Sequence, residues 1–262
     1  MGYFMNMILI DSHCHLDDDR FEEDRDQVIQ RANDLGIQQF VIAATTAQRW
    51  PKIKQICEAY QGVSASYGLH PMFMQEHQSK HVAELDAWLD TEDAVAVGEC
   101  GLDFYQGNSD EQQQLELFRG QLTVSINHKL PVIIHSRKSL DLILREIRNS
   151  GISHGVIHSF SGSLQQAEQL VDLGFKLGIA ATVSFERAKK LREVVSKIDI
   201  NALMIESDAP DQAGQQHRGD RNEPAFIIDH LRIMAELRNM PVVELAQKVT
   251  QNCRDLFALS KS

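Results

Sequence analysis

Residues 8–16 read ILIDSHCHL, an apolar run that leads directly into two histidines. Short runs of Ile and Leu bounded by polar residues are typical of buried strands. Side chains alternate between the two faces of a strand, so His13 and His15 should point to the same side and Cys14 to the other. Two neutral imidazoles on one face are suitable ligands for a divalent metal ion. A strand that merely ends in polar residues would also explain the motif, so the metal-site interpretation depends on finding further ligands.

The apolar run at residues 8–10 is the first of eight. The others lie at residues 40–44, 63–67, 94–97, 131–134, 155–157, 175–179 and 202–205. The stretches between them have helical patterns, and the repeat length of about 28 residues suits a βα unit. Eight such units predict an α/β fold, a single (β/α)8 TIM barrel that spans residues 1–262. The alternative, a doubly wound open sheet, would need a glycine-rich turn after its first strand, and the sequence has none there.

Local signals mark some helix ends. Two capping-box pairs, Ser109 with Gln112 and Ser163 with Gln166, each precede an apolar stripe and predict the start of a helix. Gly36 follows a helical pattern and suits a C-cap. The tail from residue 223 predicts the eighth helix, and residues 242–259 predict an extra C-terminal helix packed on the outside.

Composition excludes several classes of protein. The chain has 43% hydrophobic and 24% charged residues, as in ordinary globular proteins, and no apolar run long enough to span a bilayer. The first seven residues contain no Lys or Arg and do not resemble a secretion signal. The four cysteines are scattered and contain no CxxC pair, so we expect reduced thiols and a cytoplasmic location. The sequence does not indicate an oligomeric state.

The net charge of −11 opposes non-specific binding of nucleic acid, which depends on Lys and Arg neutralising phosphates. A polyanionic partner would have to be bound locally. Bound divalent cations could supply the positive charge that such a partner needs.

Polar side chains follow most of the predicted strands, at the end of a barrel where catalytic residues gather. Ionisable groups are costly to place so close to a core unless they are paired or bind metal. The candidate ligands at these strand ends are His13, His15, Glu99, His135, His158 and Asp208. Four imidazoles and two carboxylates exceed the needs of one tetrahedral ion, so they predict two divalent ions with positions open to water. Zinc, manganese and magnesium all remain possible identities.

Individual strand-end residues also have predicted roles. Glu99 is the expected bridging ligand between the two ions; the alternative is a buried pair with Arg137. Arg137 suits a phosphate oxygen or an ordinary salt bridge. His70 is expected to contact the substrate, although a metal ligand or a structural histidine would also end a strand. Asp103 and Glu206 are candidates for orienting a ligand. The other histidines are expected at the surface: His77, His81, His128, His154, His217 and His230.

These segments together resemble the TatD family of metal-dependent hydrolases, within the amidohydrolase superfamily. The matching motifs are DSHCHLD, GLHP, GECGLDFY, PVIIHSR, HSFSG and ESDAP, with RNEP beyond them. They follow the family's order over almost the whole chain and are closest to a branch described mainly as metal-dependent hydrolases. The resemblance implies a (β/α)8 barrel, two divalent ions and the same six ligands. Two positions differ from the usual pattern: Ser12 replaces Thr, and Asp211-Gln212 stands where nuclease members commonly have Tyr-Leu.

The resemblance also implies an activity, because better-known members are deoxyribonucleases that often act from the 3′ end. We therefore expect a deoxyribonuclease that cleaves phosphodiester bonds of single-stranded DNA with a metal-activated water. Asp208 would accept the proton of that water, and Glu99 would hold both ions. The alternatives are a small-molecule hydrolase acting on an amide, lactone or phosphotriester, and a metal-binding protein without activity.

Overall fold

The computed structural model describes residues 7–107 and 110–260. Within these ranges eight parallel strands pair in sequence order, from β1 to β8. Their bounds are β1 Leu9–Cys14, β2 Ile37–Ala43, β3 Val63–Tyr67, β4 Ala96–Asp103, β5 Val132–Arg137, β6 Gly155–Ile157, β7 Phe175–Ile179 and β8 Leu203–Ile205. Each apolar run predicted as a strand overlaps one of them. The predicted (β/α)8 barrel is confirmed.

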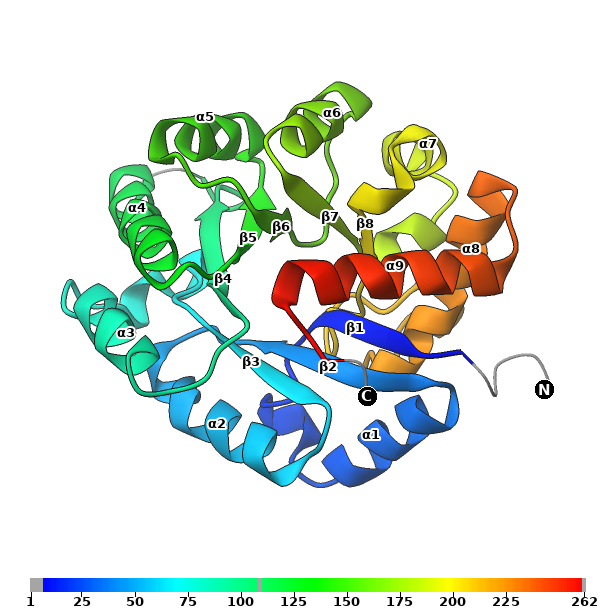
Figure 1. Ribbon diagram of the computed structural model, residues 1–262, viewed down its shortest axis with the longest axis horizontal. Coiled ribbons are helices and arrows are strands. Elements are labelled where there is room, and N and C mark those ends of the chain that lie inside the picture. Colours follow the sequence, from blue (N-terminus) through cyan, green and yellow to red (C-terminus); the bar gives the residue numbers. More distant parts are fainter. Residues whose placement is uncertain (1–6, 108–109, 261–262) are drawn as a thin grey trace.

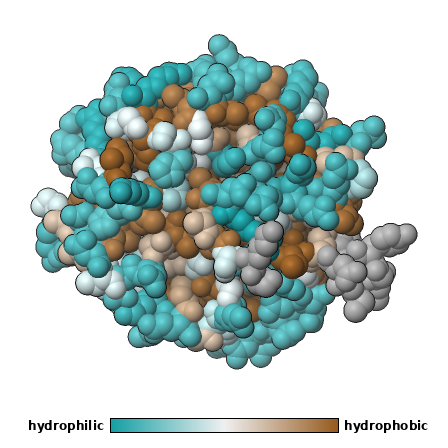
Figure 2. All heavy atoms as spheres, in the orientation of Figure 1, coloured by the Kyte–Doolittle hydropathy of each residue, from teal (hydrophilic) through white to brown (hydrophobic). Residues whose placement is uncertain are grey.

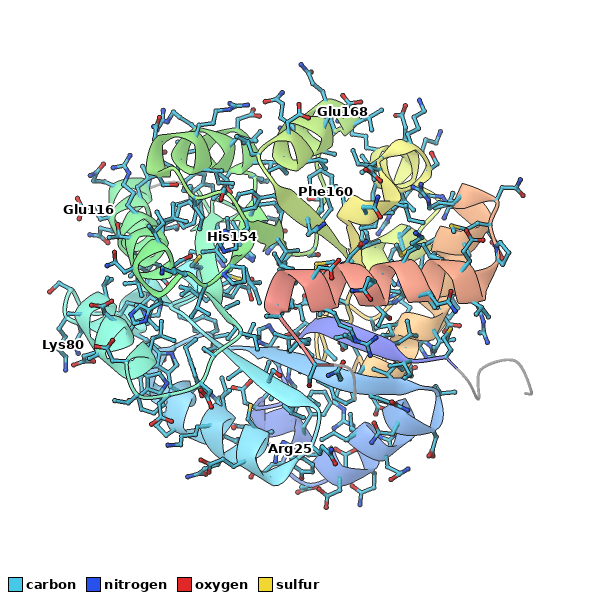
Figure 3. The ribbon with its side chains drawn as sticks, in the orientation of Figure 1. Arg25, Lys80, Glu116, His154, Phe160 and Glu168 are labelled. Atoms are coloured by element: carbon cyan, nitrogen blue, oxygen red, sulfur yellow. The ribbon has the colours of Figure 1, made fainter. Side chains whose placement is uncertain are left out.

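Helices form a ring around the strands, as Figure 1 shows. They are α1 Arg25–Asp34, α2 Trp50–Ala59, α3 His81–Leu89, α4 Glu111–His128, α5 Leu140–Ser150, α6 Leu164–Asp172, α7 Lys189–Lys197 and α8 Ile227–Arg238. Lys80, Glu116 and Glu168 point outward from this ring in Figure 3. Hydrophilic residues cover most of the rim in Figure 2, with hydrophobic residues in the grooves between helices. No helix in the described ranges is long and apolar enough to cross a bilayer.

Hydrogen bonds that join the second half of β1 and the residue after it to the end of β8 and its following loop close the barrel. The Asp208 N–H donates to the His13 carbonyl at 3.0 Å, and the His15 N–H donates to the Ala209 carbonyl at 2.7 Å. The Ser12 hydroxyl adds a bond to the Ile205 carbonyl at 2.9 Å. These bonds join residues almost 200 positions apart in the sequence, and they fix the loops after β1 and β8 against each other.

The extra C-terminal helix α9, Val242–Phe257, lies across one opening of the barrel (Figure 1). Inward side chains from six strands form the barrel core: Ile10, Val41, Ala96, Ile133, Val156 and Met204. Cys253 and Phe257 of α9 belong to the same buried cluster. Because α9 also contacts the start of β1 through a Thr250–Ile8 hydrogen bond, it covers the end of the barrel opposite the strand-end loops.

The capping signals have different outcomes. The capping box of Ser163 and Gln166 is confirmed at the start of α6. Ser109 lies outside the described residues, so its pair stays a prediction. Gly36 adopts a φ of 88° after α1, a left-handed conformation that favours glycine.

Candidate metal centre

Ring closure brings the first and last strand ends into one cluster with Glu99. Glu99 lies within β4, and two glycines, Gly101 in β4 and Gly178 in β7, leave room for close approach around the cluster. A Cβ on Gly101 would lie 2.0 Å from the His135 backbone oxygen, and one on Gly178 would lie 2.2 Å from the Glu206 carboxylate. The first glycine lets β4 and β5 carry Glu99 and His135 side by side. The second leaves space for a buried carboxylate beneath His158.

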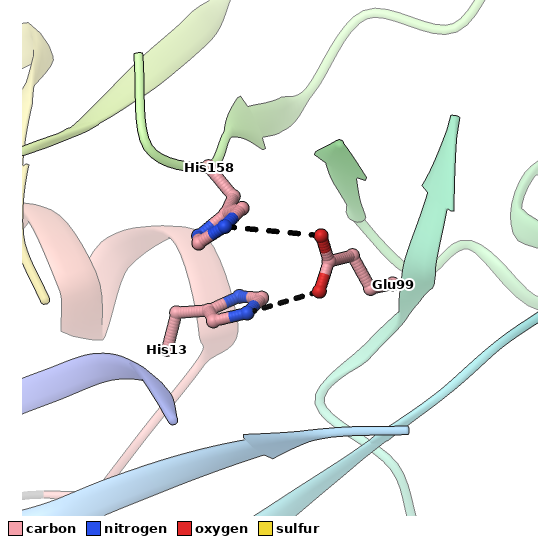
Figure 4. Close-up of side chains that lie close together, drawn as sticks. All are labelled: His13, Glu99 and His158. Atoms are coloured by element: carbon pink, nitrogen blue, oxygen red, sulfur yellow. Dashed lines mark ion pairs between the residues drawn. The ribbon is translucent and has the colours of Figure 1, made fainter. Parts of the chain in front are cut away.

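Glu99 stands at the centre of the cluster and presents one oxygen to each half of it. Its Oε2 lies 3.1 Å from His13 Nε2 and 3.7 Å from His15 Nε2. Its Oε1 lies 3.0 Å from His135 Nδ1 and 3.8 Å from His158 Nε2. Figure 4 shows the His13 and His158 rings stacked beside each other, each facing a different oxygen of Glu99. This is the arrangement that a bridging carboxylate requires.

Asp208 faces the same imidazoles from the other side. Its Oδ1 lies 3.5 Å from His13 Nε2, 3.5 Å from His15 Nε2 and 3.6 Å from His158 Nε2. Burial alone would raise the pKa of Asp208, but His158 and His15 hold it well below its usual value. The pKa of Glu99 is likewise held well below its usual value, against the effect of burial, chiefly by His70 and His158. Both carboxylates are therefore ionised at neutral pH.

Three imidazoles have an oxygen atom within 2.9 Å of the nitrogen that faces away from the cluster centre. His15 Nδ1 lies 2.9 Å from the Ala43 carbonyl, and His158 Nδ1 lies 2.9 Å from Glu206 Oε1. His135 Nε2 lies 2.8 Å from Asp103 Oδ2. A proton held on the outer nitrogen leaves the inner nitrogen free to bind a metal ion, and such partners orient metal ligands in known sites. Asp103 and Glu206, the candidates for orienting a ligand, thus each contact one of the predicted ligands.

The donor set fits divalent metal ions. Among the described residues, ligand atoms within 4.8 Å of one another form three groups: His13 with Glu99 and His158, His13 with His15 and Asp208, and His70 with Glu99 and His135. All six predicted ligands fall within these groups. Imidazole nitrogen and carboxylate oxygen suit zinc and manganese in particular, and such a concentration of buried ionisable groups needs a compensating charge.

His70 also belongs to the cluster, through Glu99. Its Nδ1 accepts a hydrogen bond from the Met72 N–H at 3.0 Å, so its Nε2 carries the proton and donates to Glu99 Oε1 at 3.0 Å. Burial lowers the pKa of His70 to about 4, which keeps the ring neutral. In this arrangement His70 holds Glu99 and offers no free nitrogen to a metal. It also lines the cavity above the cluster, so the predicted substrate contact stays a prediction.

A cavity of about 660 Å³ opens above the cluster, and its wall includes three arginines. Arg20 binds Asp18 and Asp211, and Arg49 binds Asp19. Arg137 has no carboxylate within ion-pair distance among the described residues, and its guanidinium stacks 3.6 Å from the centre of the Tyr105 ring. The structure therefore shows neither an ordinary salt bridge of Arg137 nor a buried pair of Arg137 with Glu99. Arg137 remains free to bind an anion.

Sequence reasoning did not identify Gln212 and Ser159. The Gln212 amide donates to Asp208 Oδ2, and its carbonyl accepts from the Ser159 hydroxyl at 3.1 Å. The sequence signal for Gln212 was Asp211-Gln212 in place of the Tyr-Leu that nuclease members commonly have after Pro210. This departure did not show that Gln212 contacts Asp208.

Two histidines expected at the surface are buried. His230 is 1% exposed because it lies on the inner face of α8 with Ile227, Leu231 and Met234. Its helical spacing from these residues could have indicated this. His81 is 5% exposed at the start of α3, where its ring accepts a hydrogen bond from the Gln78 N–H at 3.2 Å.

Comparison with known proteins agrees with the fold. Residues 10–258 match the family described as TatD related DNase. The chain belongs to the TatD family. It is 36% identical over 251 residues to the uncharacterized metal-dependent hydrolase YjjV of Escherichia coli K12, covering 95% of this chain and 97% of that protein. It is 31% identical over 258 residues to the uncharacterized metal-dependent hydrolase YabD of Bacillus subtilis, covering 97% and 100%.

Solved structures of TatD proteins show the same barrel. The crystal structure of Escherichia coli YjjV, a TatD homologue, superposes with a TM-score of 0.93 at 35% identity, covering 96% of this chain and 98% of that one. A TatD family hydrolase from Entamoeba histolytica superposes with a TM-score of 0.85 at 24% identity, covering 96% and 98%, which shows the fold alone. This TatD-family chain is therefore a metal-dependent hydrolase, and it has a cluster of side chains that could hold metal ions.

Proposed function

We propose that this hydrolase cleaves phosphodiester bonds near the end of a single DNA strand and uses two divalent ions. The observation that carries the proposal is an unpaired guanidinium, Arg137, in the wall of a cavity that is also lined by five of the six predicted ligands. A guanidinium recognises phosphate oxygens through paired N–H donors. A cavity of about 660 Å³ suits a strand end better than a duplex. The family description, TatD related DNase, supports the same substrate class.

His13, His15, Glu99 and Asp208 would hold one ion, and His135, His158 and Glu99 the other. The ions would supply a lowered pKa for water and positive charge for the phosphate oxygens. Asp208 is ionised and faces the cavity, so it can accept the proton of the attacking water. Arg137 would bind a non-bridging phosphate oxygen and orient the phosphorus toward that water. Glu206 and Asp103 would keep His158 and His135 in position through the turnover.

The test is hydrolysis of end-labelled single-stranded DNA by the purified protein, with Mn²⁺, Zn²⁺ or Mg²⁺ and with a chelator. We expect metal-dependent shortening of the strand that the chelator abolishes. Asp208→Asn should lower the rate by about 100-fold or more, since general-base catalysis contributes roughly that much. Near-full activity of Asp208→Asn with metal bound would show that another group takes the proton.

A small-molecule hydrolase is the second candidate, because a cavity of about 660 Å³ also has the size of a small-molecule site. A lactone and a phosphotriester assayed beside the DNA strand separate the two functions. Turnover of either compound with no cleavage of DNA would overturn the nuclease proposal.

A further inference from the structure

A second cavity, of about 500 Å³, adjoins the one above the metal-ligand cluster. Ser136 and Ser161 line both cavities, so the two lie side by side. Phe104, Ile157 and Phe160 form an apolar wall of the second cavity. Figure 3 shows Phe160 within the ring of helices. The site described above uses none of these three residues.

Two consecutive cations stand where the cavities meet. Arg137 lines the first cavity and Lys138 lines the second. Both lie over the ring of Tyr105, with the Arg137 guanidinium carbon 3.6 Å and the Lys138 Nζ 5.0 Å from its centre. Tyr105 is 54% exposed, which is unusual for a large aromatic residue. The ring holds the two cations beside each other at the boundary.

These cations are available to a ligand. Among the described residues, neither has a carboxylate within ion-pair distance, whereas Arg20 and Arg49 are occupied by aspartates. One carboxylate, Asp141, lines the second cavity, but it accepts a hydrogen bond from the Gln166 amide at 2.6 Å. In a chain with a net charge of −11, an Arg-Lys pair without a carboxylate partner at a cavity boundary offers charge that is complementary to an anion.

We infer that the second cavity binds the nucleotide adjacent to the scissile phosphodiester, an inference that rests on the proposed nuclease function. Lys138 contacts the phosphate of that nucleotide, and its base packs against Phe104 on the apolar wall. A volume of about 500 Å³ is sufficient for one nucleotide. Aromatic contact with a base does not depend on its identity, so the subsite selects for single strands and not for sequence.

The test compares a mononucleoside aryl phosphodiester, which fills only the first cavity, with a trinucleotide, which reaches the second. Lys138→Glu should raise the KM for the trinucleotide about tenfold more than the KM for the aryl ester. It should also make the trinucleotide KM less dependent on salt, because one phosphate contact is lost. Phe104→Ala should raise the trinucleotide KM in the same selective way, with little change in the salt dependence.

Lys129→Glu is the matched control. Lys129 and Lys138 both adopt a φ of 57°, so glutamate meets the same backbone cost at each position. Lys129 follows α4 and precedes β5, so it lies at the opposite end of the barrel from the cluster. We expect this variant to keep wild-type KM values for both substrates.

An unchanged trinucleotide KM in Lys138→Glu, or an equal rise for both substrates, would overturn the second subsite while leaving the nuclease function in place. Failure of the wild-type protein to hydrolyse either phosphodiester with metal would instead overturn the proposed function, and the subsite with it.

Discussion

At the scale of single residues, the site depends on which atom of each side chain faces inward. Asp208 illustrates this, because its Oδ1 faces three imidazoles while its Oδ2 accepts a hydrogen bond from Gln212. Gln212 is in turn held by Ser159, whose N–H donates to Glu206 Oε1 at 2.6 Å. A continuous polar chain therefore links the loops after β6 and β8, and it fixes the orientation of two predicted ligands.

Gln212→Leu tests the contribution of this chain. The substitution removes the donor to Asp208 Oδ2 and restores the Leu of the Tyr-Leu pattern. We expect Mn²⁺ affinity to fall about tenfold, as for other residues that orient metal ligands, with the unfolding temperature of the metal-free protein unchanged. Isothermal titration calorimetry gives the affinity, and Gln216→Leu, at an exposed position on the same loop, is the control. Unchanged Mn²⁺ affinity in Gln212→Leu would mean that Asp208 does not need this hydrogen bond.

Several residue-level contacts could not be predicted from the sequence. The strand-end rule identified His13, Glu99 and Asp208 because a ligand that follows a buried run leaves a local pattern. Gln212 left no such pattern, since its partner is defined only when β8 has closed against β1. The Arg20–Asp211 ion pair joins positions 191 residues apart, so it could not be predicted from the sequence either.

At the scale of elements, helix α9 completes the barrel core. Phe257 is 3% exposed and belongs to the buried cluster formed by inward residues of the strands. The sequence predicted this helix and placed it on the outside of the fold, without indicating the surface against which it packs. The structure shows that it also covers the end of the barrel. Spacing identifies which face of a helix is buried, but it does not identify the surface against which that face packs.

Phe257→Ala tests the role of α9. Removing a buried phenyl ring should lower the free energy of unfolding by about 3–5 kcal/mol, measured by chemical denaturation. Metal stoichiometry should stay unchanged, because Phe257 lies at the opposite end of the barrel from the cluster. Val243→Ala, on an exposed position of the same helix, is the control and should cost far less. A loss as small as that of Val243→Ala would show that the barrel core does not depend on this ring.

At the scale of the whole molecule, the barrel concentrates buried charge at one end and apolar packing at the other. Folding without metal ions must therefore bring buried carboxylates and imidazoles together without the charge of a metal ion. Ions that bind only the folded chain add to its stability, by about 2.7 kcal/mol for each ion at a concentration 100 times its dissociation constant.

Metal removal should consequently lower the unfolding temperature. We expect exhaustive chelation to shift the transition downward by several degrees, and added Mn²⁺ or Zn²⁺ to reverse the shift in proportion to the logarithm of its concentration. Differential scanning calorimetry measures both effects. A transition that does not respond to either treatment would show that no ion binds preferentially to the folded chain.

The central claim is that strand ends from across the chain form one centre for two divalent ions. Anomalous X-ray diffraction from crystals grown with Mn²⁺ tests it most directly. The account predicts two anomalous peaks within the cluster, one beside each oxygen of Glu99, with His13, His15 and Asp208 around the first and His135 and His158 around the second. A single peak, or peaks outside these six side chains, would contradict it.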